Sequence, residues 1–196
     1  MFGKLFGKKK ENPSKFIIVN LNAKLQPMHR GEFFEDPIDQ KIQELSLGTV
    51  TGGGTLQSES GEIENCDIEI QVQSVEPEAI ESIKNIFESF GAPKGSKITL
   101  DSSGSIIEFG VTEGLALYLN GTDLPPEIYK NSDINYVISE ITSLLVGKGT
   151  MLSHWQGNTE TALYFYGQSF VEMKDLISAF LDSYPLCQKA RVVQIA

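Results

Sequence analysis

The sequence predicts an α+β fold, built as a tandem duplication of a ferredoxin-like β-α-β-β-α-β unit with antiparallel sheets. Apolar side chains alternate along short segments in both halves, as in strands with one buried face. Longer segments carry apolar residues at helical spacing, and the elements recur in the same order at offsets of 93 to 96 residues. A linker rich in Ser and Gly at residues 101–105 separates the two halves.

The first repeat is predicted at residues 16–100. Asp36 and Pro37 suit the start of a helix, because Asp accepts a hydrogen bond at the N-cap and Pro fits the first turn. Gly91 sits where a helix C-terminal glycine belongs. The predicted order is strand 15–23, helix 36–48, strands 49–56 and 63–75, helix 77–91 and strand 96–100.

The second repeat is predicted at residues 106–196. Ser132 and Asp133 are expected to form the capped start of its first helix, and Ser169 with Glu172 forms a capping box that starts its second helix. Its predicted order matches the first repeat: strand 111–120, a helix from 132, strands 149–155 and 161–166, a helix from 169 to 184, and strand 190–195.

Matching apolar positions indicate that the second half is a copy of the first. An offset of 96 carries Val19 and Leu21 onto Leu115 and Leu117. Offsets of 95 and 93 match the third strand and the second helix, carrying Ile68 and Ile70 onto Leu163 and Phe165, and Ile80, Ile83 and Phe87 onto Met173, Leu176 and Phe180.

Charge is unevenly distributed along the chain. Residues 1–15 carry five lysines and one glutamate, a net +4, whereas the whole chain has a net charge of −10, which leaves −14 for the remainder. An acidic body repels phosphate backbones and favours encounter with a basic protein surface. We therefore expect a protein partner and no nucleic acid. The basic tail at residues 1–15 is expected to be flexible and too short for stable membrane anchoring.

The sequence offers no metal or catalytic constellation. Cys66 and Cys187 are its only cysteines, and His29 and His154 its only histidines, so no zinc-ligand spacing exists and no cofactor is expected. No apolar run approaches the roughly 20 residues of a membrane-spanning helix. The N-terminus also lacks the features of a secretory signal. We expect a cytoplasmic protein that is not an enzyme.

The segment at residues 28–37 is the most unusual in the chain. It places His29, Arg30, Glu32 and Glu35 in one predicted loop, where the arginine offers paired donors to a partner. This loop is one candidate binding site. The alternative is a helix-entry loop in which one of its two adjacent phenylalanines fills the core.

Polar and aromatic residues of the two predicted hairpins supply further candidates. Asp67 and Glu69 alternate with apolar residues, so they are expected on the exposed face of a strand, either as a solvated surface or as a docking surface for a basic partner. Trp155 belongs to an aromatic patch, interpreted as sheet packing or as a binding platform. The glycines at residues 52–54 lack the helix and lysine of a phosphate loop and indicate a bulge.

Four stretches of the first half carry a resemblance to known proteins: residues 19–32, 35–37, 52–55 and 61–70. They resemble a family of uncharacterised bacterial cytosolic proteins, and this resemblance brings no catalytic motif. The small size, the acidic body and the Met-Phe-Gly start also resemble immunity proteins of bacterial polymorphic toxin and contact-dependent inhibition systems. That second resemblance implies an inhibitor that docks an acidic surface on a basic toxin.

Two alternative functions stay open on the sequence. His29, Arg30 and Glu32 would serve a small-ligand enzyme or binding protein if their side chains converge on a concave pocket. A homodimeric structural or regulatory protein, joined through exposed edge strands, also fits a duplicated α+β fold.

Overall fold

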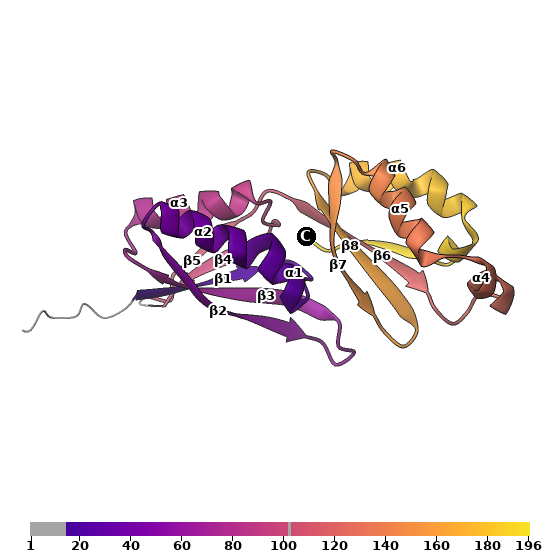
Figure 1. Cartoon of the computed structure of the whole chain (residues 1–196), viewed down its shortest axis with the longest axis horizontal. Helices are drawn as coiled ribbons and strands as arrows, with labels where there is room; N and C mark the ends of the chain where they lie inside the picture. The colour runs from indigo at the N-terminus through magenta and orange to yellow at the C-terminus, as the bar shows by residue number, and fades with distance from the viewer. Residues whose placement is uncertain (1–14, 102) are drawn as a thin grey trace, which may run out of the picture.

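The computed structural model describes residues 15–101 and 103–196 (Figure 1). The predicted basic tail, apart from Lys15, lies outside these residues. The described chain forms two antiparallel sheets, each with helices packed on one face. The fold is therefore α+β, as the sequence predicts. Among the helices in these two ranges, none is long and apolar enough to cross a membrane.

The first unit contains a five-stranded sheet in the order β2-β3-β1-β4-β5. Neighbouring strands pair antiparallel throughout. Its elements are β1 (Lys15–Leu21), α1 (Pro27–Arg30), the π-helical turn η1 (Gly31–Glu35), α2 (Asp36–Glu44), β2 (Gly48–Gln57), β3 (Ile63–Val72), α3 (Pro77–Ser89), β4 (Ser96–Leu100) and β5 (Ile106–Phe109).

The second unit contains a four-stranded sheet in the order β7-β8-β6-β9, which repeats the first four strands of the first sheet. In both units the fourth strand lies beside the first, which is the ferredoxin-like arrangement. Its elements are β6 (Glu113–Asn120), α4 (Pro126–Asn131), α5 (Ile134–Leu144), β7 (Gly149–Gln156), β8 (Glu160–Gly167), α6 (Phe170–Ser183), the 3-10 turn η2 (Pro185–Cys187) and β9 (Arg191–Gln194).

A β-bulge at the same place in both units supports the duplication. The register shifts between Val50 and Gly52 in β2, and between Met151 and Ser153 in β7. Each shift lies opposite equivalent residues of the third strand, which matches between units at the predicted offset of 95. Shared bulges are features of a common backbone, since the apolar pattern alone does not require them.

The predicted offset of the first strand is wrong by two residues. Val19 pairs with Ile68, whereas Leu163, the equivalent of Ile68, pairs with Leu117 and not with Leu115. The first strand therefore matches at an offset of 98 instead of 96. A slip of two residues keeps the same face buried, so alternation of apolar residues cannot detect it.

The boundary between the units lies later than predicted. The sequence predicts that residues 106–109 belong to the second repeat, but they form β5 and pair with β4 of the first sheet. Phe109 is buried against Phe87 of α3, with ring centroids 6.0 Å apart in an edge-on arrangement. A four-residue strand is too short for the period-two pattern to identify, which is why the sequence did not indicate it.

The predicted loop at residues 28–37 is helical. Helix α1, the π-helical turn and α2 follow one another without a break, so Asp36 lies inside the helix and does not cap it. The N–H of Asp36 donates to the Gly31 carbonyl, five residues back. This wider turn accommodates Pro37, which has no N–H to donate.

The two units share a buried interface. Tyr118, Tyr164 and Tyr166 lie on the face of the second sheet opposite its helices, and they belong to the apolar core of the first unit. Leu163 and Phe165 point to the core beneath α5 and α6. Strand β8 is therefore buried on both faces. Figure 1 shows the C-terminus between the two units.

Candidate functional site

Arg30 is a buried structural residue, contrary to its predicted role at a partner surface. It is 7% exposed. Its Nε donates to Glu35 Oε1 at 2.7 Å, and its Nη1 donates to the Gly54 carbonyl at 2.8 Å and to Thr55 Oγ1 at 2.6 Å. These bonds use the donors that a partner carboxylate would need. The Arg30–Glu35 pair instead fixes the continuous helical segment α1-η1-α2, which we call the first crossover helix, on the edge strand β2.

The glycine run of β2 makes this contact possible. A Cβ at Gly53 would overlap Glu35 Oε1 and crowd Arg30 Nε, whereas a Cβ at Gly52 would meet open space. Gly53 therefore lets the ion pair rest on the strand. The bulge that the sequence predicts here is confirmed by the register shift at residue 51.

His29 links the two units. Its Nδ1 lies 3.0 Å from Ser153 Oγ, and its ring centroid lies 5.8 Å from that of His154. Burial lowers the pKa of His29, and the nearby His154 lowers it further, against an opposing effect of Glu32. Ser153 is only 2% exposed, so its hydroxyl is closed to a substrate. The Ser–His pair is therefore a contact between units and not a nucleophile with its base.

A pocket of about 520 Å³ opens beside this contact. Gln26 and Gln57 of the first unit and His154 and Trp155 of the second unit contribute to its lining. Trp155 is half-buried and packs against the first core, as the sheet-packing interpretation predicts, and the binding platform stays a prediction. None of the three residues that the small-ligand hypothesis requires lines this pocket.

Glu62 is the centre of a polar network between the units. Its Oε1 accepts hydrogen bonds from Tyr118 Oη at 2.6 Å and Tyr164 Oη at 2.8 Å, and lies 2.9 Å from Lys24 Nζ. Burial raises the pKa of Glu62, but these donors outweigh burial and hold it below its usual value. Burial also raises the pKa of both tyrosines, which therefore remain protonated donors.

The sequence reasoning missed this network because its members lie far apart in the chain. Glu62 and Tyr164 are separated by 102 residues. The only signal was that two tyrosines, Tyr164 and Tyr166, stand at alternate positions of β8. Period-two alternation places them on the sheet face away from the helices, which a single unit would leave exposed. Burial of that face depends on the first unit, and no local pattern reports it.

Asp67 and Glu69 lie on the open face of the first sheet, as the alternation predicts. Both are half-buried, and each accepts a hydrogen bond from a neighbouring strand: Asp67 from Asn20 Nδ2 at 2.8 Å, and Glu69 from Thr51 Oγ1 at 2.6 Å. Glu32 is exposed on the crossover helix instead. The predicted site residues therefore lie on separate surfaces.

Metal and thiol chemistry find no support in the described part of the chain. In residues 15–101 and 103–196, no cluster of three or more His, Cys, Asp or Glu side chains is arranged to hold a metal ion. Burial raises the pKa of Cys66 to about 12 and that of Cys187 to about 11. Both thiols therefore stay protonated near neutral pH, and a thiol is a poor nucleophile.

Comparison with known proteins yields only remote structural similarity. No protein-family model and no curated protein matches the chain. The chain is similar to the ZRD-deleted mutant of TiaS in complex with agmatine, at 9% identity over 84% of this chain, with a TM-score of 0.30, and spans 57% of that protein.

Two further solved structures cover most of both chains. A putative monooxygenase from Fusobacterium nucleatum subsp. nucleatum is 13% identical, with 92% of this chain and 91% of that chain covered and a TM-score of 0.31. A mutant chlorite dismutase from Candidatus Nitrospira defluvii is 9% identical, with 93% and 91% covered and a TM-score of 0.31. At such TM-scores these similarities carry no argument about function.

Proposed function

We propose that this chain is a protein-binding module that recognises a basic protein surface. The observation that carries the proposal is the open face of the first sheet, which presents Asp67 and Glu69 side by side on β3; we call it the acidic face. The net charge of −14 outside the basic tail would speed encounter with a cationic partner.

Fixed carboxylates beside apolar side chains suit this role. The hydrogen bonds from β1 and β2 hold both carboxylates in place, so binding would order few side chains. On the same face, Ile18 of β1 lies opposite Glu69. Two strands beyond β1, on β5, the side chain of Ile106 also lies on this face and is 60% exposed. An apolar area next to charged groups is the usual composition of a protein interface.

The narrower proposal is an immunity-type inhibitor that neutralises a bacterial toxin. The acidic face would cover a basic active site, with one inhibitor bound to each toxin. The resemblance to immunity proteins and the charge of the body support this form of the proposal. Growth rescue in cells that express the toxin encoded by the adjacent gene is its direct test. The narrower proposal fails if that gene encodes no toxin and native cells yield no partner.

Charge reversal tests the acidic face itself. The double substitution Asp67→Lys and Glu69→Lys should weaken binding of the basic partner at least tenfold in titration calorimetry. The control is Glu127→Lys with Asp175→Lys, which changes net charge equally at exposed positions of the second unit and should change affinity less than twofold. Equal weakening by both pairs, or by neither, would contradict the proposal.

Small-ligand binding at the pocket between the units is a second candidate, favoured by its volume and by the Trp155 wall. A ligand of this pocket would raise the melting temperature of the wild-type protein. It would have no such effect on Gln57→Trp, in which a larger side chain from an exposed position fills the pocket. A screen with no such ligand would remove this candidate.

A further inference from the structure

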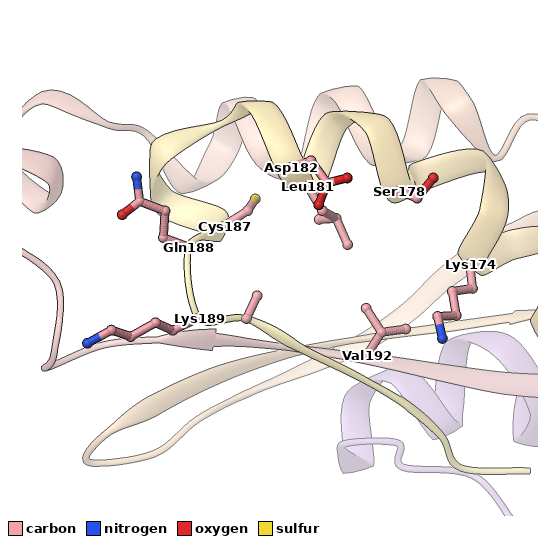
Figure 2. A pocket seen from close by; sticks show the side chains of 9 residues that line it. Lys174, Ser178, Leu181, Asp182, Cys187, Gln188, Lys189 and Val192 are labelled. Atoms are coloured by element: carbon pink, nitrogen blue, oxygen red, sulfur yellow. The ribbon is translucent and has the colours of Figure 1, made fainter.

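The second sheet ends in an open edge with a groove beside it. Strand β9 is the outer strand of that sheet, and a groove of about 480 Å³ lies between β9 and α6 (Figure 2). Leu181, Cys187 and Val192 give the groove an apolar interior, and Figure 2 shows Lys174 and Lys189 at its two ends. The charged residues that line the groove are these two lysines and Asp182, so the groove is apolar inside and has a net positive charge.

In the first unit, the chain itself fills the equivalent place. Strand β4 and helix α3 correspond to β9 and α6, because each strand lies outside the first strand of its unit. Strand β5 adds antiparallel to β4, with Ser96 opposite Phe109. The Phe109 ring then lies against Phe87 of α3 and is 7% exposed. The fold thus accepts a fifth strand that inserts an apolar side chain between helix and sheet.

The backbone of β9 is oriented to accept such a strand. The N–H of Ile195 donates to β6 at 2.9 Å, so by alternation the N–H groups of Val192 and Gln194 point toward the open edge. In β4 the corresponding outward N–H of Leu100 donates to the Ser105 carbonyl at 3.0 Å. The outward N–H at this position is therefore hydrogen-bonded to the following strand in the first unit, whereas in the second unit it faces the open edge.

The charge of the rim selects the kind of occupant. Lys189 Nζ donates to the Asp123 carbonyl at 2.8 Å, which is a neutral acceptor. Lys174 is exposed at the other end. Arg191 of β9 is paired with Glu160 at 2.8 Å, so the charge that remains for an occupant comes from the two lysines, which outnumber Asp182. An acidic segment would meet complementary charge.

We propose that this groove binds an extended peptide segment of another protein, which adds to β9 as a fifth strand. The segment carries apolar side chains at alternate positions and an acidic residue between them, as β5 does with Ile106-Ile-Glu-Phe109. In β5 that acidic residue, Glu108, lies 3.7 Å from Lys97 on the face away from the groove, and the equivalent of Lys97 in β9 is Arg191. Main-chain hydrogen bonds to the edge supply affinity, and the groove selects the apolar side chain. This site belongs to the second unit and is separate from the acidic face.

A labelled peptide with the sequence of residues 104–110 is the probe, measured by fluorescence polarisation with the full chain. Saturable binding is expected, at least fivefold weaker when the peptide Glu is replaced by Lys. Gln194→Pro removes an outward N–H without removing a bond to β6, and should weaken binding at least tenfold. The control Gln194→Ala keeps that N–H and should bind within twofold of wild type.

A second variant covers the case in which proline disturbs β9. Ser178→Phe places a ring in the groove from an exposed helix position and should also weaken binding at least tenfold. Amide shifts on binding should map to Val192 and Leu181. Absence of saturable binding, or binding that neither variant weakens, would overturn the proposal.

Two further controls separate this proposal from its alternatives. A dimer in light scattering that Gln194→Pro dissociates would mean that a second copy occupies the edge, and the peptide proposal would be wrong. The double variant Asp67→Lys and Glu69→Lys should keep its affinity for the peptide. If the proposal for the acidic face is wrong, the proposal for the groove therefore still stands, and a wrong groove proposal would not affect the one for the acidic face.

Discussion

The two units share one fold but expose different parts of it. In the first unit, β5 covers the edge of the fourth strand, while the sheet face opposite the helices stays open. In the second unit, that sheet face is buried against the first unit, while the edge at β9 stays open. The first unit therefore has a covered edge and an exposed sheet face, whereas the second unit has a covered sheet face and an exposed edge.

Side chains at equivalent positions follow this division. At the offset of 95 that relates β3 to β8, Asp67 and Glu69 correspond to Ala162 and Tyr164. The carboxylates stand where the face is open, whereas Ala162 and Tyr164 are fully buried. Replacing a few charged residues on the outer face of one copy by apolar or aromatic residues is thus enough to let that face pack against the other unit.

The largest expected effect is at the covered edge of the first unit. Phe109→Ala should lower the free energy of unfolding by about 3–5 kcal/mol, because it leaves a cavity between α3 and β4. The control Ile106→Ala lies on the same strand but is 60% exposed, and should change stability by less than about 0.5 kcal/mol. Urea denaturation measures both. Equal losses would show that β5 does not complete the first core.

The second prediction concerns the ion pair that ties the first crossover helix to β2. Gly53→Ala should destabilise the protein by about 1–3 kcal/mol, because its Cβ displaces Glu35 from Arg30. Gly52→Ala meets open space and should stay within about 0.5 kcal/mol of wild type. Thermal melts of the two variants check this. A destabilised Gly52→Ala with a stable Gly53→Ala would contradict the described packing.

The third prediction tests the covered face of the second unit through Glu62. Its pKa in the folded protein is lowered, so its stabilising contribution is present above the ordinary carboxyl pKa of about 4.3 and is lost as pH falls below it. Glu62→Gln should cost about 1–3 kcal/mol at pH 7, because it leaves Lys24 without its carboxylate partner. The difference from wild type should shrink between pH 5 and pH 3. A constant difference would argue against an ionised Glu62.

The smallest effect is expected at His29. Its pKa is lowered in the folded protein, so the unfolded chain binds a proton more readily and stability falls as pH drops through the ordinary histidine pKa of about 6.5. His29→Gln lacks this contribution and should lose less stability than wild type between pH 7.5 and pH 5.5. Chemical denaturation at the two pH values gives the comparison. A larger loss in the variant would have the wrong sign.

Local patterns in the sequence predicted those parts of the fold that local contacts determine. The caps at Asp133 and Ser169 are confirmed, each side chain accepting a backbone N–H. Gly91 has the positive φ of 80° that its place after a helix predicts. In α6, however, Leu176 is 39% exposed and Ile177 carries the burial, because both residues fit an apolar stripe of that width.

The features that failed depend on distant segments. The sequence predicts that residues 27–36 form a loop because they are polar. They are helical, and Arg30 is buried there because it donates hydrogen bonds to β2, 24 residues away in the chain. The Glu62 network needs side chains of the second unit. Asp67 and Glu69 were placed correctly because strand alternation alone decides their face. The groove at β9 could not be foreseen, since it is formed jointly by α6, the turn after it and β9, which no local pattern reports.

Amide hydrogen exchange at two pairs of equivalent residues tests the complementary coverage most directly. The outward N–H groups of Ile98 and Leu100 face β5, whereas those of Val192 and Gln194 face the open edge. In the monomeric protein, the first pair should exchange slowly and the second pair at nearly unprotected rates. Equal protection of the two pairs would show that the second edge is already covered, and would contradict the account.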